Sequence, residues 1–169
     1  MIRLSRLADY GIVIMTHLAR QAERQFATPE IAQATQVPQP TTSKLLKVLA
    51  RAELLISHRG AHGGYSLARS PEAISVADVI EAVDGPIALT ACTEIGVNDC
   101  GIERLCPART NWQRINRAIR EALAGISIAE MSRAVPAVFL LSGETRTSET
   151  PAEPASRGPV TTIEDAIGV

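Results

Sequence analysis

The sequence predicts a mainly α fold, a winged helix-turn-helix with a β-hairpin wing and a long C-terminal dimerisation helix. Aromatic residues make up only 3% of the 169 residues, and Ala, Leu, Ile and Val dominate, which favours helices. Two short helical segments precede a glycine-rich hairpin, and an amphipathic stripe follows them. We expect a DNA-binding domain over 1–84, a cysteine loop over 85–107, the dimerisation helix with a short following helix over 108–135, and a largely disordered tail over 136–169.

The first two helices are predicted from their caps. Ser5 is expected to cap a helix that runs to about Gln25, and Thr28 to cap a shorter helix with Pro29 in the first helical position. The apolar residues of the first helix recur at helical spacing and should be buried: Leu7, Ile14, Met15, Leu18 and Ala19.

The third helix, expected from Pro40 to about Glu53, is the candidate recognition helix. A short helix, a turn and a second helix with a polar, basic face form the helix-turn-helix arrangement. The apolar side should be buried: Leu45, Leu46, Leu49 and Ala52. The polar face should contact DNA, with the hydroxyls nearer the base edges and the chain's only lysines mostly at phosphates: Thr41, Thr42, Ser43, Lys44 and Lys47. On an isolated helix such a face would indicate solvated surface.

A β-hairpin is predicted directly after this helix. Residues 54–58 and 65–68 have the pattern of strands, and a glycine-rich turn joins them. The glycines allow close approach to a phosphate, and Arg59 and His62 can reach the DNA backbone or minor groove. A nucleotide-binding loop is the alternative, but no helix starts after the glycines.

The charge distribution also favours a polyanionic partner. Residues 1–70 contain nine Lys/Arg and four Asp/Glu, whereas residues 71–169 contain eight Arg and fourteen Asp/Glu. A basic first half is typical of proteins that bind nucleic acid, although ordinary surface charge gives the same balance. The N-terminus lacks the pattern of a signal peptide and no apolar run is long enough to span a membrane, so we expect a cytoplasmic protein.

All three cysteines lie in one polar loop. Cys92, Cys100 and Cys106 are separated by seven and five residues, a spacing that lets the loop direct all three sulfurs toward one centre. Soft thiolates bind zinc and iron–sulfur clusters, so the loop is a candidate metal or cluster site. The alternative is a set of inert thiols, or one disulfide with a spare cysteine. Before this loop, Ser75 and Asp78 resemble a capping box for a helix through Val83.

The long helix after the loop carries a coiled-coil-like stripe. Its apolar residues recur at three- and four-residue steps: Trp112, Ile115, Ile119 and Leu123. Such a stripe is most simply buried against its copy in a second chain, which predicts a homodimer. Packing against the same chain is the alternative. Ser127 and Glu130 suggest a second capping box for the short helix that follows.

Together these residues resemble the IscR/NsrR winged-helix regulators, which hold an iron–sulfur cluster. The resemblance covers about residues 1–135 and rests on the opening MIRLS with Asp9 and Tyr10, the wing RGAHGGY, the segment ISVADVI and the three-cysteine loop. The phrases SKLLK and NWQRIN are most like the regulator of the SUF iron–sulfur assembly operon. The resemblance implies a homodimeric repressor that binds an operator on double-stranded DNA and reports iron–sulfur supply through a 2Fe-2S or 4Fe-4S cluster.

The fourth cluster ligand follows from the resemblance alone. IscR-type members have a histidine three residues after the last cysteine, but here that position is Arg109, which cannot ligate. NsrR-type members use an aspartate of the first helix from the other chain of the dimer, and Asp9 matches it. The implied ligands are Cys92, Cys100, Cys106 and Asp9. Asp9 also suits a helix N-terminus, where a carboxylate is favourable without any ligand role.

Three other functions are open on this sequence. A nitric-oxide sensor of NsrR type would have the same ligands. A zinc-binding or metal-free thiol switch could be built on the same fold. A thiol-exchange enzyme is disfavoured, because the cysteines form no Cys-x-x-Cys pair and have no adjacent histidine to lower a thiol pKa, so we expect no enzymatic activity.

Overall fold

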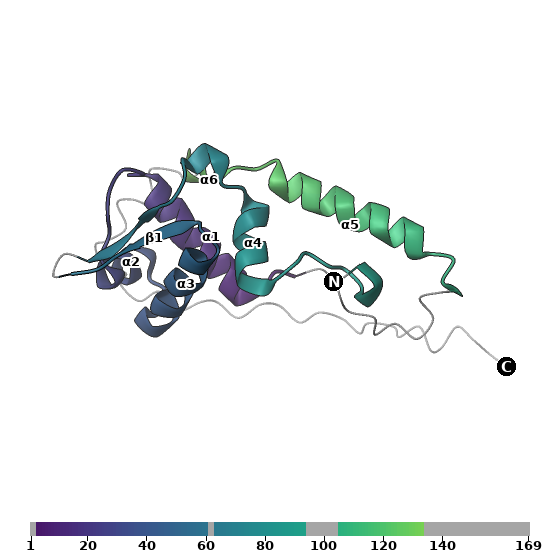
Figure 1. Cartoon of the computed structure of the whole chain (residues 1–169), viewed down its shortest axis with the longest axis horizontal. Coiled ribbons are helices and arrows are strands. Elements are labelled where there is room, and N and C mark those ends of the chain that lie inside the picture. Colours follow the sequence, from purple (N-terminus) through teal and green to yellow (C-terminus); the bar gives the residue numbers. More distant parts are fainter. Residues whose placement is uncertain (1–2, 61–62, 94–104, 134–169) are drawn as a thin grey trace, which may run out of the picture. The chain divides into compact units, whose positions relative to one another are not determined.

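The chain is a helical winged-helix unit from which one long helix extends. The computed structural model describes residues 3–60, 63–93 and 105–133. In order these form α1 (Arg6–Ala19), α2 (Thr28–Thr35), α3 (Gln39–Arg51), β1 (Leu55–His58), β2 (Gly64–Leu67), the 3-10 turn η1 (Pro71–Ala73), α4 (Val76–Asp84), the 3-10 turn η2 (Ala91–Thr93), α5 (Arg109–Ala124) and α6 (Ile128–Arg133) (Figure 1). The predicted fold class is confirmed. The predicted tail, residues 136–169, lies outside the described residues.

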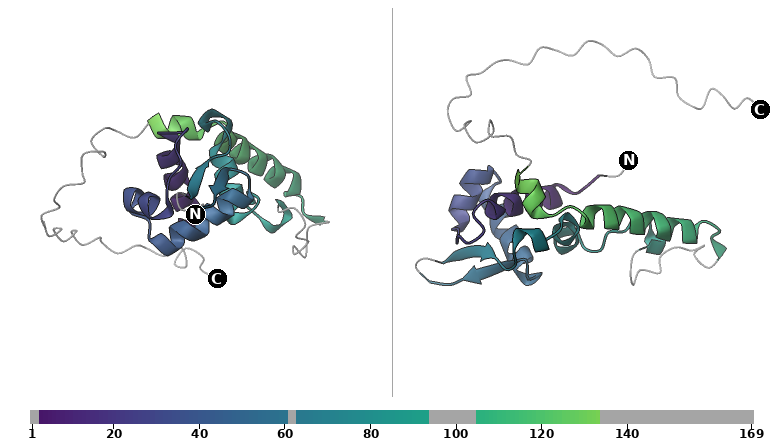
Figure 2. Two further views of the ribbon diagram at one scale, coloured as in Figure 1. Left: turned by 60° about the vertical axis from the view of Figure 1, so that its left-hand side comes forward. Right: turned by 90° about the horizontal axis from the view of Figure 1, so that it is seen from above.

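The core lies where α1, α3, α4 and α6 meet. The most deeply buried side chains come from all four helices and include Met15, Leu46, Val79 and Ile128, each 0% exposed. Gly11 lets α1 approach α4 closely, because a Cβ there would lie 3.2 Å from Val83 Cγ2. In Figure 2 α6 lies beside α1, which it contacts. This core therefore holds α3, the predicted recognition helix, against α1 and α4. We call α2, α3 and the wing (β1 and β2) the DNA-reading unit.

Helix α1 begins as predicted and ends earlier. The Ser5 hydroxyl accepts a hydrogen bond from the Ala8 amide at 2.9 Å, so the predicted cap is present. The helix stops at Ala19 rather than near Gln25, because the chain turns to bring Phe26 against the wing. Phe26 is 2% exposed, and it exchanges two backbone hydrogen bonds of 2.9 Å with Tyr65.

Helices α2 and α3 of the DNA-reading unit each begin one residue before the predicted start. Ala27, not Thr28, is the N-cap of α2, and Thr28 is the first helical residue. Helix α3 starts at Gln39 and ends at Arg51. The predicted burial of Leu45, Leu46 and Leu49 is confirmed, whereas Ala52 follows the end of the helix and is exposed.

The wing is a two-stranded antiparallel hairpin. Leu55 pairs with Leu67 and His58 with Gly64, which places the glycine-rich turn at its tip. Gly64 is required where β2 passes Phe26, since a side chain there would collide with the Phe26 carbonyl oxygen. Among the described residues, no helix has both the length and the apolar character needed to cross a membrane.

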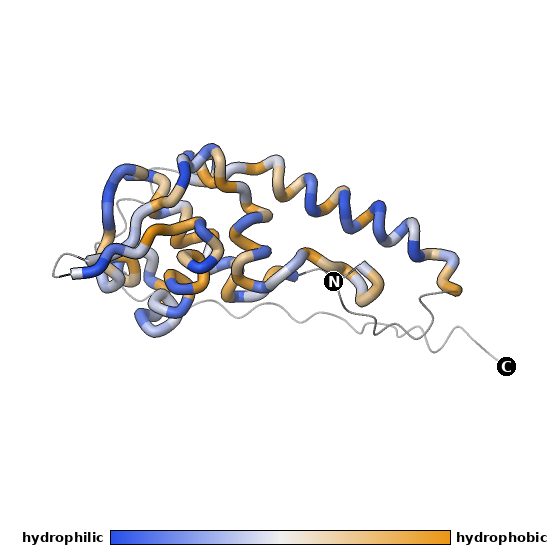
Figure 3. Tube along the Cα trace, viewed as in Figure 1, coloured by the Kyte–Doolittle hydropathy of each residue, from blue (hydrophilic) through white to orange (hydrophobic). Residues whose placement is uncertain are grey.

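Helix α5 differs from the other helices because it buries none of its residues. Hydrophilic and hydrophobic positions alternate along it in Figure 3. Its C-terminal end is attached to the core, where the amides of Val76 and Ile128 donate to the carbonyls of Ile126 and Ile74, each at 2.9 Å. The Ser127–Glu130 capping box is present, with bonds of 2.8 and 3.2 Å between each backbone amide and the other side chain. The chain thus leaves the core after α4 and returns along α5, which leads into α6.

Candidate DNA-binding surface and cysteine loop

The exposed side of α3 carries most of the predicted DNA contacts. Lys44 and Lys47 are exposed, and Thr41 and Ser43 are half-buried. Helical spacing places Thr41, Lys44 and Lys47 along one side of α3, while its leucines face the core. These side chains form a short basic and hydroxyl-bearing surface, which we call the α3 surface and define as Thr41, Ser43, Lys44 and Lys47.

Thr42 does not belong to the α3 surface. Its side chain is 0% exposed, and its hydroxyl lies 3.2 Å from the carbonyl oxygens of Val37 and Pro38. A buried side chain that donates to the preceding turn cannot reach a base, so the prediction for Thr42 was wrong. The spacing contained the correct signal, since position 42 lies three and four residues before Leu45 and Leu46. Thr42 instead fixes α3 on the turn that joins it to α2.

The wing presents its basic residue at the tip. Arg59 is exposed and precedes Gly60, whose φ of +112° favours glycine. The Gly63 amide closes the turn by donating to the Gly60 carbonyl oxygen at 2.9 Å. His62, the other predicted contact in the wing, lies outside the described residues. The wing therefore places one described cation beside the glycine turn.

The described ends of the cysteine loop carry two free thiols. Cys92 lies in η2, Cys106 lies shortly before α5, and both are unbridged and half-buried. The Cys92 sulfur is 3.2 Å from the Thr90 hydroxyl oxygen. Cys100 lies outside the described residues. Within the described part of the chain, no three His, Cys, Asp or Glu side chains gather as metal ligands.

The donor chemistry of these two ends fits an iron–sulfur cluster. The two described donors are soft thiols on either side of a third, and they are neither paired with each other nor fully buried. Asp9 lies in the first turn of α1 with an exposed side chain, where its carboxylate is accessible to a second chain. The same position suits the helix dipole, so both interpretations of Asp9 stand.

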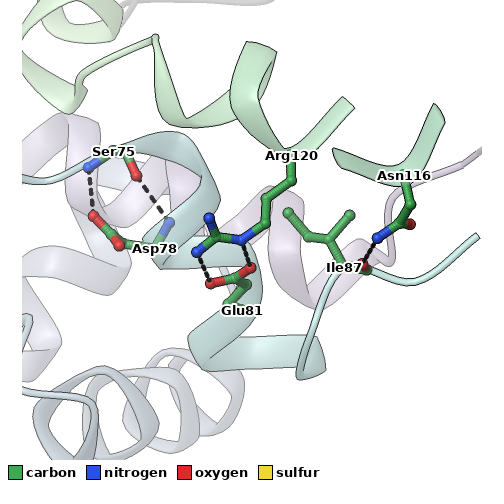
Figure 4. Close-up of polar contacts among 6 residues, drawn as sticks. All are labelled: Ser75, Asp78, Glu81, Ile87, Asn116 and Arg120. Atoms are coloured by element: carbon green, nitrogen blue, oxygen red, sulfur yellow. Dashed lines mark hydrogen bonds and ion pairs between the residues drawn. The ribbon is translucent and has the colours of Figure 1, made fainter. Parts of the chain in front are cut away.

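Two polar contacts dock α5 on the rest of the chain, and the sequence analysis missed both (Figure 4). Arg120 makes a bidentate contact with Glu81 of α4, at 2.6 and 3.1 Å. These hydrogen bonds raise the pKa of Arg120. Asn116 donates to the Ile87 carbonyl oxygen at 2.8 Å and accepts from the Leu89 amide at 3.0 Å. The available signal was a polar Asn116 between Trp112 and Ile119 of the apolar stripe.

The predicted dimerisation stripe divides into two parts. Trp112 is 38% exposed and Ile115 is 44% exposed, which are high values for large apolar side chains. Ile119 is half-buried, and Leu123 packs against the edge of the core. The C-terminal part of the stripe is thus partly covered within the chain, whereas its N-terminal part remains uncovered.

The comparisons place the chain among transcriptional regulators. Residues 4–134 match the Rrf2 family, described as an iron-dependent transcriptional regulator. Protein rrf2 of Nitratidesulfovibrio vulgaris is 30% identical over 132 residues, or 78% of this chain and 87% of that protein. The structure of CymR, the global cysteine regulator of B. subtilis, has a TM-score of 0.63 and 30% identity, and covers 80% of this chain and 100% of that one. The structure of T. potens IscR has a TM-score of 0.58 and 28% identity, and covers 84% of this chain and 94% of that one.

Proposed function

This chain belongs to the Rrf2 family of transcriptional regulators, and from that premise we propose that it is a homodimeric repressor whose operator affinity is controlled by an iron–sulfur cluster. The observation that carries the proposal is the loop with all three cysteines between the winged helix and the long amphipathic helix. Its two described thiols are free and half-buried. The proposed target is a set of iron–sulfur assembly genes of the SUF type.

The cluster would be held by Cys92, Cys100 and Cys106, with Asp9 of the other chain as the fourth ligand. When bound, the cluster supplies a redox-active and oxygen-sensitive centre. A hard carboxylate is a weak partner for thiolate-bound iron, so this ligand set should make the cluster labile, which suits a sensor. In this proposal, cluster binding orders the cysteine loop between α4 and α5, and this ordering changes the affinity for the operator.

The DNA contacts would come from the α3 surface and the wing. Lys44, Lys47 and Arg59 should neutralise phosphates, with Thr41 and Ser43 nearer the bases, and His62 is proposed as a further contact to the DNA backbone or minor groove. A twofold dimer reads two half-sites about 34 Å apart, or a multiple of that, so the operator should be near-palindromic. The dimer would form through the uncovered stripe of α5, which contains Trp112 and Ile115, with Ile119 and Leu123 at its edge.

The test of the cluster is an absorption spectrum with iron and sulfide counts on protein purified without oxygen. The proposal expects brown protein, an operator affinity that changes when the cluster is lost, and loss of that response in Cys92→Ser, Cys100→Ser and Cys106→Ser. Asp9→Ala should shorten the cluster's lifetime while leaving the fold intact. Colourless, iron-free protein whose operator affinity ignores the cysteine substitutions would contradict the proposal.

The DNA contacts have their own test. Lys44→Ala or Lys47→Ala should weaken binding to all sequences and lower the salt slope of log K by about 0.9 for each phosphate that is no longer neutralised. Arg24→Ala is the matched control, because this arginine pairs with Glu30 at 2.6 Å outside the α3 surface. A salt slope that stays the same in both lysine variants would place these lysines away from the DNA.

A second function is favoured by one observation, the similarity to CymR, the global cysteine regulator. In that case the chain would respond to the cell's cysteine supply, with no cluster in the response. Iron-free protein would then bind its operator at full affinity, and the three serine variants would behave like the wild type. The spectrum and the operator titration together separate the two functions.

A further inference from the structure

The Asn116 side chain bonds to the backbone of the segment that carries Cys92. Its Nδ2 donates to the Ile87 carbonyl oxygen at 2.8 Å (Figure 4), and its Oδ1 accepts from the Leu89 amide at 3.0 Å. One side chain thereby satisfies two backbone groups of the segment between α4 and η2. Both contacts are part-buried, so an apolar replacement would leave two backbone groups without a partner.

A set of hydrogen bonds that begins at Thr90, the residue after Leu89, reaches the Cys92 sulfur. Directly after Leu89, the Thr93 hydroxyl donates to the Thr90 carbonyl oxygen at 2.8 Å and accepts from the Thr90 amide at 3.2 Å. This closes η2 around Cys92, whose sulfur lies 3.2 Å from the Thr90 hydroxyl oxygen. The Cys92 end of the loop is therefore already shaped by this chain's own side chains.

The same face of α5 also contacts α4, which in turn packs against α3. Arg120 lies one helical turn after Asn116 and pairs with Glu81 of α4 at 2.6 Å. Helix α4 packs against both α1 and α3. Of the two contacts, the Asn116 contact is the part-buried one, whereas the Arg120 pair is exposed to solvent and to screening by salt. Asn116 thus holds the segment before Cys92 on α5, and Arg120 holds α5 on α4.

We propose that Asn116 is a positioning residue for the iron–sulfur cluster: it holds the Cys92 end of the loop on α5, and through this bond a change at Cys92 reaches α5 and α4. The inference rests on the proposed function. Because Asn116 keeps the Cys92 end on α5 with or without the cluster, a shift of Cys92 when the cluster binds or leaves would be passed to α5, the helix that sets the two winged helices in the dimer. Without Asn116, the loop and α5 would move independently.

The first measurement uses cluster-free protein and the exchange of the Leu89 amide hydrogen with solvent. In the wild type this amide should be protected, and Asn116→Ala should speed its exchange at least tenfold. Gln113→Ala is the matched control, because it removes an exposed amide side chain from the same helix and should leave the exchange rate of Leu89 unchanged. An unprotected Leu89 amide in the wild type would overturn the inference.

The second measurement uses cluster-loaded protein. Asn116→Ala should shorten the cluster's lifetime in air and bring the ratio of operator affinities, loaded against cluster-free, several-fold closer to one. Asn116→Asp keeps the acceptor for Leu89 but turns a carboxylate oxygen toward the Ile87 carbonyl, so its effects should be intermediate. Wild-type lifetime and affinity ratio in both variants would overturn the inference while leaving the proposed function standing.

A third variant covers the case in which Asn116→Ala loosens α5 as a whole. Thr90→Val leaves α5 untouched and removes only the hydroxyl beside Cys92. It should shift the cluster's absorption bands while the Leu89 amide stays protected, and Thr90→Ser should restore the spectrum. Unchanged cluster absorption bands in Thr90→Val would show that the Thr90 hydroxyl does not act on the Cys92 sulfur, and would overturn this part of the inference. Wild-type protein that never holds iron and sulfide would instead end the proposed function, and the coupling with it.

Discussion

The winged-helix core and helix α5 are stabilised in different ways. In the core, residues such as Met15, Leu46 and Ile128 are 0% exposed, and their burial is non-directional and collectively large. Helix α5 buries no residue and is positioned by Asn116, by Arg120 and by the return of the chain at Ile126–Ile128. The core can therefore fold without help, whereas α5 needs directional bonds and, in our proposal, a second chain.

This difference suits a regulator. A packed core resists small displacements because its side chains fit together closely. A helix held by a few polar contacts can change its position at a modest cost in free energy. If the cysteine loop is a sensor, its signal should act on α5 and leave the fold of the DNA-reading unit unchanged. The predictions that follow test this division, in order of decreasing effect.

The largest effect is expected in the core. Leu46→Ala should lower the free energy of unfolding by about 2–5 kcal/mol, because it removes buried methyl groups and leaves a cavity. Urea unfolding followed by circular dichroism measures this change. Ile115→Ala is the comparison within α5, and at a protein concentration too low for dimers it should cost less than about 1 kcal/mol, since its side chain is already 44% exposed. Equal losses of unfolding free energy in the two variants would contradict the proposed difference between the packed core and α5.

The next effect concerns association rather than folding. Ile115→Asp should weaken dimer formation by about 2 kcal/mol or more, roughly a thirtyfold rise in the dissociation constant, because it places a charge in the proposed apolar interface. Sedimentation across a range of concentrations measures the constant. Arg69→Asp is the control, since it changes the charge by two units at an exposed position outside α5. If both variants remain dimeric, Ile115 does not lie in the interface.

A smaller effect is expected at the base of the recognition helix. Thr42→Val keeps the shape of the side chain but removes the hydroxyl that bonds to the carbonyls of Val37 and Pro38. We expect a loss of about 1 kcal/mol in the free energy of unfolding. The salt slope of DNA binding should stay at its wild-type value, in contrast to Lys44→Ala. Weaker operator binding by folded Thr42→Val would restore Thr42 to the DNA surface, because a neutral hydroxyl that contacts a base adds to affinity and not to the salt slope.

The sequence was most informative where a local rule decides the structure. Ser5, the Ser75–Asp78 pair and the Ser127–Glu130 pair were predicted as caps, and their hydrogen bonds are present. The early end of α1 was not predictable from its own residues, because the bridge between Phe26 and Tyr65 depends on a strand far along the chain. The Asn116 contact was missed for the same reason, since its partners lie 27 and 29 residues away.

The cysteine loop shows the opposite limit. Three thiols in a polar loop indicate a common role from the sequence alone, but their ligand geometry depends on residues outside the described ranges. Asp9 depends on a second chain. The sequence could therefore predict the candidate cluster ligands. The fold added how one end of the loop is held, through Thr90 and Asn116.

The smallest expected effect is a change of thermal stability with pH that comes from His17 of α1. His17 packs edge-on against Phe26, with 5.4 Å between ring centroids, and within the described residues its Nε2 atom is buried without a hydrogen-bond partner. Burial lowers the pKa of His17 below its ordinary value of 6.5, and the charge of Arg20 lowers it further, while Glu30 opposes the shift. As the pH falls below 6.5, the unfolded chain therefore takes up a proton before the folded chain does.

The His17 contribution to stability should thus be complete above pH 6.5 and be lost as the pH falls toward the lowered pKa of the folded state. The thermal midpoint of the wild type should decrease between pH 7.5 and 5.5, and His17→Gln should flatten this decrease because glutamine does not titrate. If the thermal midpoint of His17→Gln decreased as much as that of the wild type, the pH dependence would belong to another group. The contact between His17 and Phe26 would then add nothing to the pH dependence of stability.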